Sequence, residues 1–137
     1  MIGILIVAHG AFGEALVHSA SHVLGGRPQR VRQLGVTLHD HPDTLLPQAR
    51  ELVRELDDGD GVLVLTDMLG ATPSNIATRL LAPGRVEGLA GVNLPMLIRA
   101  LTYREEGLAS VVKKASGGGC EGVVNLMTDC CNAPNGN

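Results

Sequence analysis

The sequence predicts an α/β protein with an open, doubly wound parallel sheet in the flavodoxin-like strand order 2-1-3-4 and helices on both faces. Uninterrupted apolar runs at residues 2–8 and 62–65 lack the alternation of a half-exposed strand, which is typical of strands buried on both faces. Segments with helical periodicity separate these runs, and this succession predicts a parallel sheet. With 137 residues, the chain is long enough for one domain with a substantial core.

The predicted elements follow one another as a regular alternation. Strands are expected at residues 2–8, 31–38, 62–65, 86–92 and 122–126, and helices at about 14–24, 43–56, 72–81, 93–101 and 105–116. Thr72 is the expected N-cap of the third helix, with Pro73 as its first residue. Three glycines at 117–119 predict a flexible break before the last strand, which is expected to be an antiparallel edge strand. The domain is therefore expected to span residues 1–126, followed by a flexible tail over 127–137.

Composition argues against several classes of protein. The net charge is −3 and no Lys/Arg cluster is present, which argues against a nucleic-acid-binding surface. No apolar run reaches the length of a transmembrane helix, and the first residues enter a strand without the layout of a signal peptide. Cys120, Cys130 and Cys131 lack metal-ligand spacing and are typical of a reduced, cytoplasmic protein. We expect neither a metal nor an organic cofactor.

Two groups of histidines raise the question of a metal site. His18 and His22 lie four residues apart on the polar side of the first predicted helix, but no third ligand is evident, so a solvated face is favoured. The loop at residues 39–43 contains two histidines and two aspartates, which we interpret as a turn and helix cap. A flavin- or metal-binding domain on this fold is a weaker alternative, because only Phe12 and Tyr103 could stack on a flavin ring.

The ends of the first and third strands carry the residues with the strongest indication of function. His9 ends the first apolar run and Asp67 follows the third, and these strands are neighbours in the predicted order. A carboxylate that accepts one ring N–H fixes the tautomer of a histidine and leaves the other nitrogen as a nucleophile. The N-terminus of the third helix, at Thr72, provides an anion site nearby. This arrangement predicts reversible phosphorylation of His9; simple capping of a strand and a helix is the structural alternative.

Three segments make this prediction specific. They are residues 6–10 (IVAHG), 65–75 (LTDMLGATPSN) and 90–97 (AGVNLPML). Over about residues 1–126 the chain resembles the enzyme IIA domain of the mannose family, from the bacterial phosphoenolpyruvate:sugar phosphotransferase system. The resemblance implies that His9 is phosphorylated and that Asp67 holds its second ring nitrogen. It also implies a phosphate-binding role for four residues, namely Gly10, Thr66, Gly70 and Thr72. Ala71 stands where many members have glycine, which should be tolerated unless the position needs a positive φ.

The same resemblance implies partners. The small carrier HPr would supply the phosphoryl group and an enzyme IIB partner, not fused to this chain, would accept it for sugar uptake. A regulatory phosphoprotein of an incomplete phosphotransferase system, whose phosphorylation controls target binding, is the alternative. The family is typically dimeric and exchanges its last strand, which here corresponds to residues 123–126. No nucleic acid is expected as a partner, and a membrane only indirectly, through a permease.

Overall fold

A four-stranded, all-parallel sheet in the order β2-β1-β3-β4 forms the centre of the fold. The structure is a computed structural model and describes residues 1–130. The strands are β1 (Gly3–His9), β2 (Val31–Val36), β3 (Val62–Thr66) and β4 (Val86–Ala90). The helices are α1 (Phe12–Leu24), α2 (Pro42–Leu56), α3 (Thr72–Leu80), α4 (Leu94–Thr102), α5 (Leu108–Glu121) and the π-helical turn η1 (Leu126–Cys130). The predicted fold class and strand order are confirmed.

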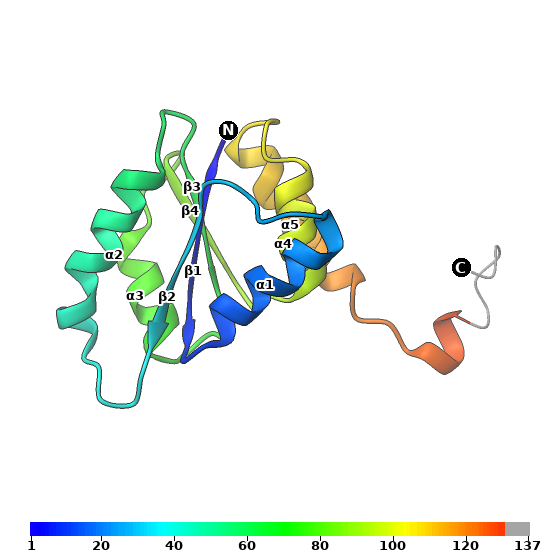
Figure 1. Cartoon of the computed structure of the whole chain (residues 1–137), viewed down its shortest axis with the longest axis horizontal. Helices are drawn as coiled ribbons and strands as arrows, with labels where there is room; N and C mark the ends of the chain where they lie inside the picture. The colour runs from blue at the N-terminus through cyan, green and yellow to red at the C-terminus, as the bar shows by residue number, and fades with distance from the viewer. Residues whose placement is uncertain (131–137) are drawn as a thin grey trace.

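Strand β1 is shared by both halves of the core. Figure 1 shows α2 and α3 on one face of the sheet and α1, α4 and α5 on the other. Ile4 and Ile6 pack with the second group of helices, whereas Leu5 and Val7 pack with the first. All four side chains are fully buried. Burial of one such side chain stabilises the fold by roughly 1.5–3 kcal/mol, so β1 joins the two layers energetically as well as geometrically.

The boundaries of the elements differ from the prediction at several ends. Strands β2 and β4 each end two residues earlier than expected, and α1 begins two residues earlier, at Phe12. The predicted start of α3 is wrong by one residue, because Ala71 is the N-cap and Thr72 is the first helical residue. The Thr72 side chain is therefore not used in capping.

The loop between β2 and α2 is a turn and a helix cap, as predicted. The carboxylate of Asp40 accepts hydrogen bonds from the Thr37 N–H (2.8 Å) and the Thr37 hydroxyl (2.9 Å). His41 is the N-cap of α2, and its Nδ1 accepts a hydrogen bond from the Asp43 N–H at 3.2 Å. The loop is thus held by its own side chains at both ends.

The predicted break at residues 117–119 is wrong, because these glycines lie inside α5. A Cβ atom on Gly118 would lie 2.9 Å from the Cβ of Arg99, and one on Gly119 would lie 2.8 Å from the Cε of Met96. Glycine costs about 1 kcal/mol relative to alanine in a helix, which is why the local pattern predicted a break. Here the absence of side chains lets α5 pack directly on α4.

The predicted C-terminal strand is absent from this single chain. Residues 123–125 have no regular secondary structure, and η1 follows them. Figure 1 shows this segment leading away from the body of the protein. Its apolar side chains are largely exposed: Val123, Val124, Leu126 and Met127. Exchange of a strand requires a second copy, so that prediction stays open; residues 131–137 of the predicted flexible tail, including Cys131, lie outside the described residues.

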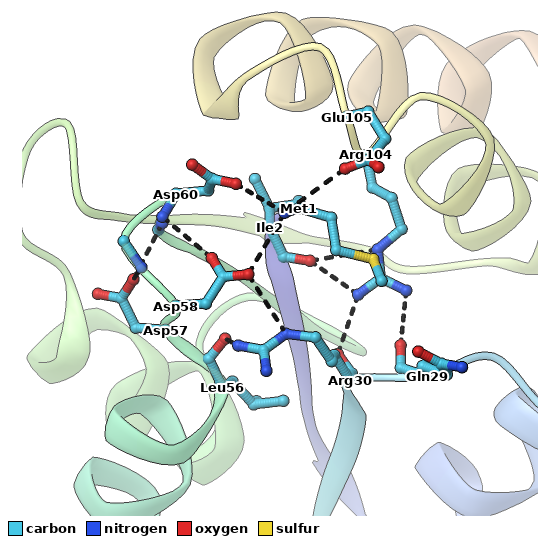
Figure 2. A network of polar contacts seen from close by, with 12 residues as sticks. Met1, Ile2, Gln29, Arg30, Leu56, Asp57, Asp58, Asp60, Arg104 and Glu105 are labelled. Atoms are coloured by element: carbon cyan, nitrogen blue, oxygen red, sulfur yellow. Dashed lines mark hydrogen bonds and ion pairs between the residues drawn. The ribbon is translucent and has the colours of Figure 1, made fainter.

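At the amino ends of the strands, Arg104 ties three chain segments together (Figure 2). Its guanidinium donates hydrogen bonds to the carbonyl oxygens of Ile2 (2.7 Å), Gln29 (2.6 Å) and Arg30 (3.0 Å). The side chain is only 7% exposed, and burial together with the nearby Arg30 lowers the pKa of the guanidinium. The result is a buried cation whose donors are matched by backbone acceptors.

Carboxylates surround the α-amino group of Met1 in the same region (Figure 2). The ammonium nitrogen lies 2.6 Å from Asp60, 3.4 Å from Asp58 and 3.5 Å from Glu105. The hydrogen bond to Asp60 is the main reason why the pKa of this amino group is raised. The positive charge of the amino terminus is therefore neutralised by carboxylates of the protein itself at this end of the sheet.

Candidate functional site

His9 and Asp67 form a hydrogen-bonded pair at the carboxyl end of the sheet. They follow adjacent parallel strands, whose register pairs Val7 with Thr66. His9 Nδ1 lies 2.7 Å from Asp67 Oδ2, and the same oxygen accepts the backbone N–H of His9 at 2.9 Å. One carboxylate oxygen therefore fixes both the backbone and the ring of His9.

The second oxygen of Asp67 is also occupied. Asp67 Oδ1 accepts the Met68 N–H at 3.0 Å, and the Thr66 hydroxyl points at it from 3.4 Å. Partial burial by itself would raise the pKa of Asp67, but the hydrogen bonds from His9 and Met68 outweigh it and lower the pKa below 3.8. Asp67 is thus a carboxylate at neutral pH and can only accept hydrogen bonds.

This pairing determines which nitrogen of His9 can react. Because Asp67 can only accept, the short contact assigns the ring proton to Nδ1 and leaves the lone pair on Nε2. The side chain of His9 is 49% exposed, whereas that of Asp67 is 15% exposed. The arrangement therefore presents a nucleophilic nitrogen to solvent and keeps its orienting carboxylate half-buried.

His9 opens into a pocket on the α2/α3 side of the sheet. Side chains alternate along a strand, so His9 shares the face of Leu5 and Val7, which pack under α2 and α3. The cavity has a volume of about 550 Å³. Its lining consists of the end of β1, the loop after β2 and the start of α3: His9, Gly10, Val36, Thr37, Leu38, His39, Asp40 and Thr72. Three separate chain segments therefore meet at the imidazole.

Two glycines make the turn after His9 possible. Gly10 has a φ of 53°, and its N–H donates to the Val36 carbonyl at 2.8 Å. A Cβ atom on Gly35 would lie 2.4 Å from the Gly10 carbonyl oxygen. The turn thus lies directly on β2, which holds His9 beside the following loop.

The start of α3 differs from the starts of α2 and α4. The side chains of His41 and Asn93 cap α2 and α4, whereas the N-cap of α3 is Ala71, whose side chain cannot accept a hydrogen bond. Ala71 has a φ of −119°, so the glycine of the family pattern is not needed here, as predicted. Thr72 then brings the first turn of α3, with its positive dipole end, to the pocket.

Ser74 orders the loop that leads into α3. Its hydroxyl accepts the N–H groups of Gly70 (2.9 Å) and Ala71 (3.2 Å) and donates to the Ala71 carbonyl (2.9 Å). Gly70 has a φ of 88°, which favours glycine at that position. This internal bonding fixes the path of the chain between Asp67 and Thr72.

The structure brings together some of the predicted site residues and separates others. Gly10 and Thr72 line the pocket with His9, and Asp67 binds the ring. Thr66 is 3% exposed and contacts Asp67, and the lining of the pocket does not include Gly70. Sequence reasoning missed the lining from the loop at residues 37–40. The predicted strand order could have revealed it, because β2 is the other neighbour of β1.

Exposed apolar side chains surround this end of the sheet. Phe12 follows β1 and is 42% exposed, Leu38 follows β2 and is 99% exposed, and Leu69 follows β3 and is 79% exposed. Met68 adds to the same loop as Leu69. Because apolar residues gather around an exposed imidazole, this surface is suited to contact with another protein.

Neither a metal cluster nor a membrane span is found within residues 1–128. No group of three or more His, Cys, Asp or Glu side chains in that range is arranged to hold a metal ion. His18 and His22 contact each other, with 3.3 Å between their Nε2 atoms, on the exposed side of α1. In the same range, every helix is too short or too polar to cross a bilayer.

Comparison with known proteins shows the family of this chain. The family model described as "PTS system fructose IIA component" (EIIA-man) matches residues 3–116. The mannose-specific EIIAB component of the phosphotransferase system (PTS) of Escherichia coli K12 is 33% identical over 106 residues, which cover 77% of this chain and 32% of that protein. The PTS fructose-specific EIIA component of Bacillus subtilis strain 168 is 31% identical over 106 residues, covering 77% and 72%.

Similarity extends to solved structures. The crystal structure of the phosphotransferase system component EIIA from Streptococcus agalactiae has a TM-score of 0.83 and 30% identity, covering 93% of this chain and 99% of that chain. The chain spans about a third of the length of the Escherichia coli EIIAB component, because only 32% of that protein is matched.

Proposed function

Because this chain belongs to the EIIA-man family of the phosphotransferase system, we propose that it is a phosphoryl carrier in which His9 is the acceptor. The Nε2 lone pair of His9 attacks the phosphorus of phosphohistidine on HPr. A new N–P bond forms on His9 while the N–P bond of the donor breaks, and the donor nitrogen recovers its lone pair. A second transfer of the same kind passes the phosphoryl group to an enzyme IIB partner.

The contact between His9 and Asp67 carries this proposal. The 2.7 Å distance between Nδ1 and the carboxylate supports the tautomer with its lone pair on Nε2. As the N–P bond forms, the imidazole gains positive charge, which the carboxylate stabilises. Thr66 acts through Asp67, since its hydroxyl contacts the carboxylate rather than the pocket.

The start of α3 supports binding of the phosphoryl oxygens. Thr72 lines the pocket with His9, and its hydroxyl is free of any capping role. The first turn of a helix has N–H groups without intrahelical acceptors, which attract anions. We assign Thr72 and this turn to the phosphoryl oxygens, and Gly10 and Gly70 to the backbone geometry of the site.

The exposed apolar residues support protein partners rather than a small-molecule substrate. Leu38 and Leu69 project from two loops on either side of His9. Such side chains become buried when two proteins bring their histidines together.

The proposal includes cytoplasmic localisation, with a membrane reached only through a permease. A regulatory phosphoprotein with the same chemistry is the alternative, and it differs only in the protein that receives or senses the phosphoryl group.

The proposal is tested by incubating the chain with phosphoenolpyruvate, enzyme I and HPr, followed by intact mass measurement. We expect one added phosphoryl group that is labile in acid and stable in base. Subsequent addition of an enzyme IIB domain should discharge it. Absence of labelling under conditions where HPr itself is phosphorylated would rule out the carrier role.

We also propose a homodimer formed through residues 123–126. The exposed apolar side chains of this segment and the outer edge of β4, where Val86 is bridged to Ala82 but no further described strand lies alongside, can cover each other between two copies. Removal of residues 123–137 leaves α5 complete and should yield a monomer in sedimentation experiments. A truncated chain that remains a dimer would show that the segment is not the exchanged element. Val123→Asp in the full chain tests the same segment without truncation, and it should likewise yield a monomer.

A further inference from the structure

The direction of His9 Nε2 points to one loop in particular. Strand β1 lies between β2 and β3, and Asp67 at the end of β3 holds Nδ1. The two nitrogens of an imidazole lie on either side of Cε1, so Nε2 is directed away from the β3 side. The segment on the other side is the β2–α2 loop, which lines the pocket together with His9. A phosphoryl group on Nε2 therefore enters space bounded by residues 37–40.

This loop has a defined shape before any ligand binds. The Asp40 N–H donates to the Thr37 carbonyl at 3.2 Å, which closes a turn with Leu38 and His39 at its tip. The Asp40 carboxylate binds the Thr37 N–H and hydroxyl, and these hydrogen bonds lower the pKa of Asp40. The acidic group is thus bonded to its own loop, and part of its charge is offset before an anion enters the pocket.

Among the described residues, His39 differs from the other histidines in that its ring makes no hydrogen bond. The chain has five histidines, all within the described residues. His9 binds Asp67, His41 caps α2, and His18 and His22 contact each other. Within residues 1–128, no hydrogen bond to the His39 ring is found, and the residue is exposed at the pocket. The imidazole without a hydrogen bond, which interacts electrostatically with the adjacent Asp40 carboxylate, is therefore the one that lines the pocket of His9.

Resting on the carrier function proposed above, we propose that His39 binds the phosphoryl group on His9 by donating a ring N–H to one of its oxygens. A phosphoryl group presents three strong acceptor oxygens and a negative charge, and imidazole donates a hydrogen bond in both its neutral and its cationic form. Thr72 approaches the same space from α3, so the two side chains would hold different oxygens. Phosphorylation would then draw the β2–α2 loop toward β1 and reposition Leu38, giving a partner protein a surface that differs between the two states.

The test is the equilibrium of phosphoryl exchange between phospho-HPr and this chain. Loss of a charge-assisted hydrogen bond in His39→Ala should shift this equilibrium about 10-fold toward phospho-HPr, which corresponds to about 1.4 kcal/mol. His39→Arg retains a donor and should stay within about threefold of the wild type. His41→Ala is the matched control, because His41 lies in the same loop but caps α2, and it should leave the exchange unchanged.

A second readout separates binding from a merely structural role. The ring signals of His39 in nuclear magnetic resonance spectra should change on phosphorylation far more than those of His41. An exchange equilibrium of His39→Ala within twofold of the wild type, or an equal loss in His41→Ala, would overturn the assignment. If the wild-type chain acquires no phosphoryl group on His9, the carrier function itself is refuted, and the role of His39 with it.

Discussion

The two ends of the parallel sheet differ in whether their polar groups have partners within the protein. At the amino end, Arg104 and the Met1 ammonium find acceptors in nearby carbonyls and carboxylates, and Arg30 Nε is a buried nitrogen without a hydrogen bond, 3.9 Å from Asp58 (Figure 2). At the carboxyl end, one hydrogen-bonded pair leaves Nε2 of His9 open to solvent beside a pocket. The amino end has more ion pairs and hydrogen bonds, yet the carboxyl end has the reactive atom. Exposure of an unsatisfied, oriented nitrogen is therefore a better indication of chemistry here than the density of polar contacts.

This comparison predicts that changes at the carboxyl end remove phosphoryl transfer without unfolding the protein. His9→Ala should abolish phosphorylation, because no other histidine ring in the described residues has a carboxylate at hydrogen-bond distance; the Asp43 carboxylate lies 3.7 Å from His41 Nδ1. Its stability should stay within about 1 kcal/mol of the wild type, since the side chain is half-exposed. Mass spectrometry of the phosphorylated chain measures the first effect and denaturant titration the second. A label found on His18 or His22 in this variant would show that the site has been assigned to the wrong histidine.

Asp67→Asn should slow phosphoryl transfer strongly while leaving the strand ends in place. An amide can still accept the His9 backbone N–H, but it cannot stabilise the positive charge that develops on the ring. Loss of such a preorganised electrostatic partner is worth about 2.7–4 kcal/mol in the transition state, or roughly a 10²–10³-fold lower rate. Rapid-quench measurement of transfer from phospho-HPr gives this rate directly. Transfer at the wild-type rate would exclude the orienting role of Asp67.

The amino end should show the reverse behaviour. Arg104→Met removes the side-chain donor from the carbonyls of Ile2 and Gln29 and one of two donors from that of Arg30, and should lower the free energy of unfolding by about 2–5 kcal/mol. Transfer from phospho-HPr should be unchanged wherever the variant is folded. Arg54→Met is the control and should cost about 0.5 kcal/mol or less, because among the described residues Arg54 forms an exposed ion pair with Glu51 and no other. A transfer defect in folded Arg104→Met would show that the two ends are coupled.

The two ends should also respond to opposite extremes of pH. The pKa of Asp67 is lowered from 3.8, so its contribution to stability is present above that value and is lost as pH falls through the folded-state pKa. The pKa of the Met1 amino group is raised from 8.0, so its contribution is present below that value and is lost as pH rises. Unfolding curves should show a smaller acid dependence in Asp67→Asn and a smaller alkaline dependence in Asp60→Asn. Identical pH profiles in wild type and both variants would contradict these shifts.

Local pattern was sufficient for the centre of the site. The uninterrupted apolar run of β1 predicted a strand buried on both faces, and strand order then placed His9 beside Asp67. This worked because a parallel sheet fixes which strand ends are adjacent, and the side chain that ends each strand can be found in the sequence. The pairing of His9 with Asp67 is thus the confirmed part of the site, while its role in phosphoryl transfer is a proposal.

The sequence by itself determined the layers of the fold and the two residues at the strand ends, because burial and periodicity are encoded within a few neighbouring residues. Only the tertiary structure decided that the glycines at 117–119 continue α5. Side chains on Gly118 and Gly119 would collide with Arg99 and Met96 on another helix. The tertiary structure also brought His39 to the pocket and Arg104 to Ile2, 102 residues away and directly before β1. Contacts of this kind depend on how helices and loops pack on the sheet, and no short-range pattern records that packing.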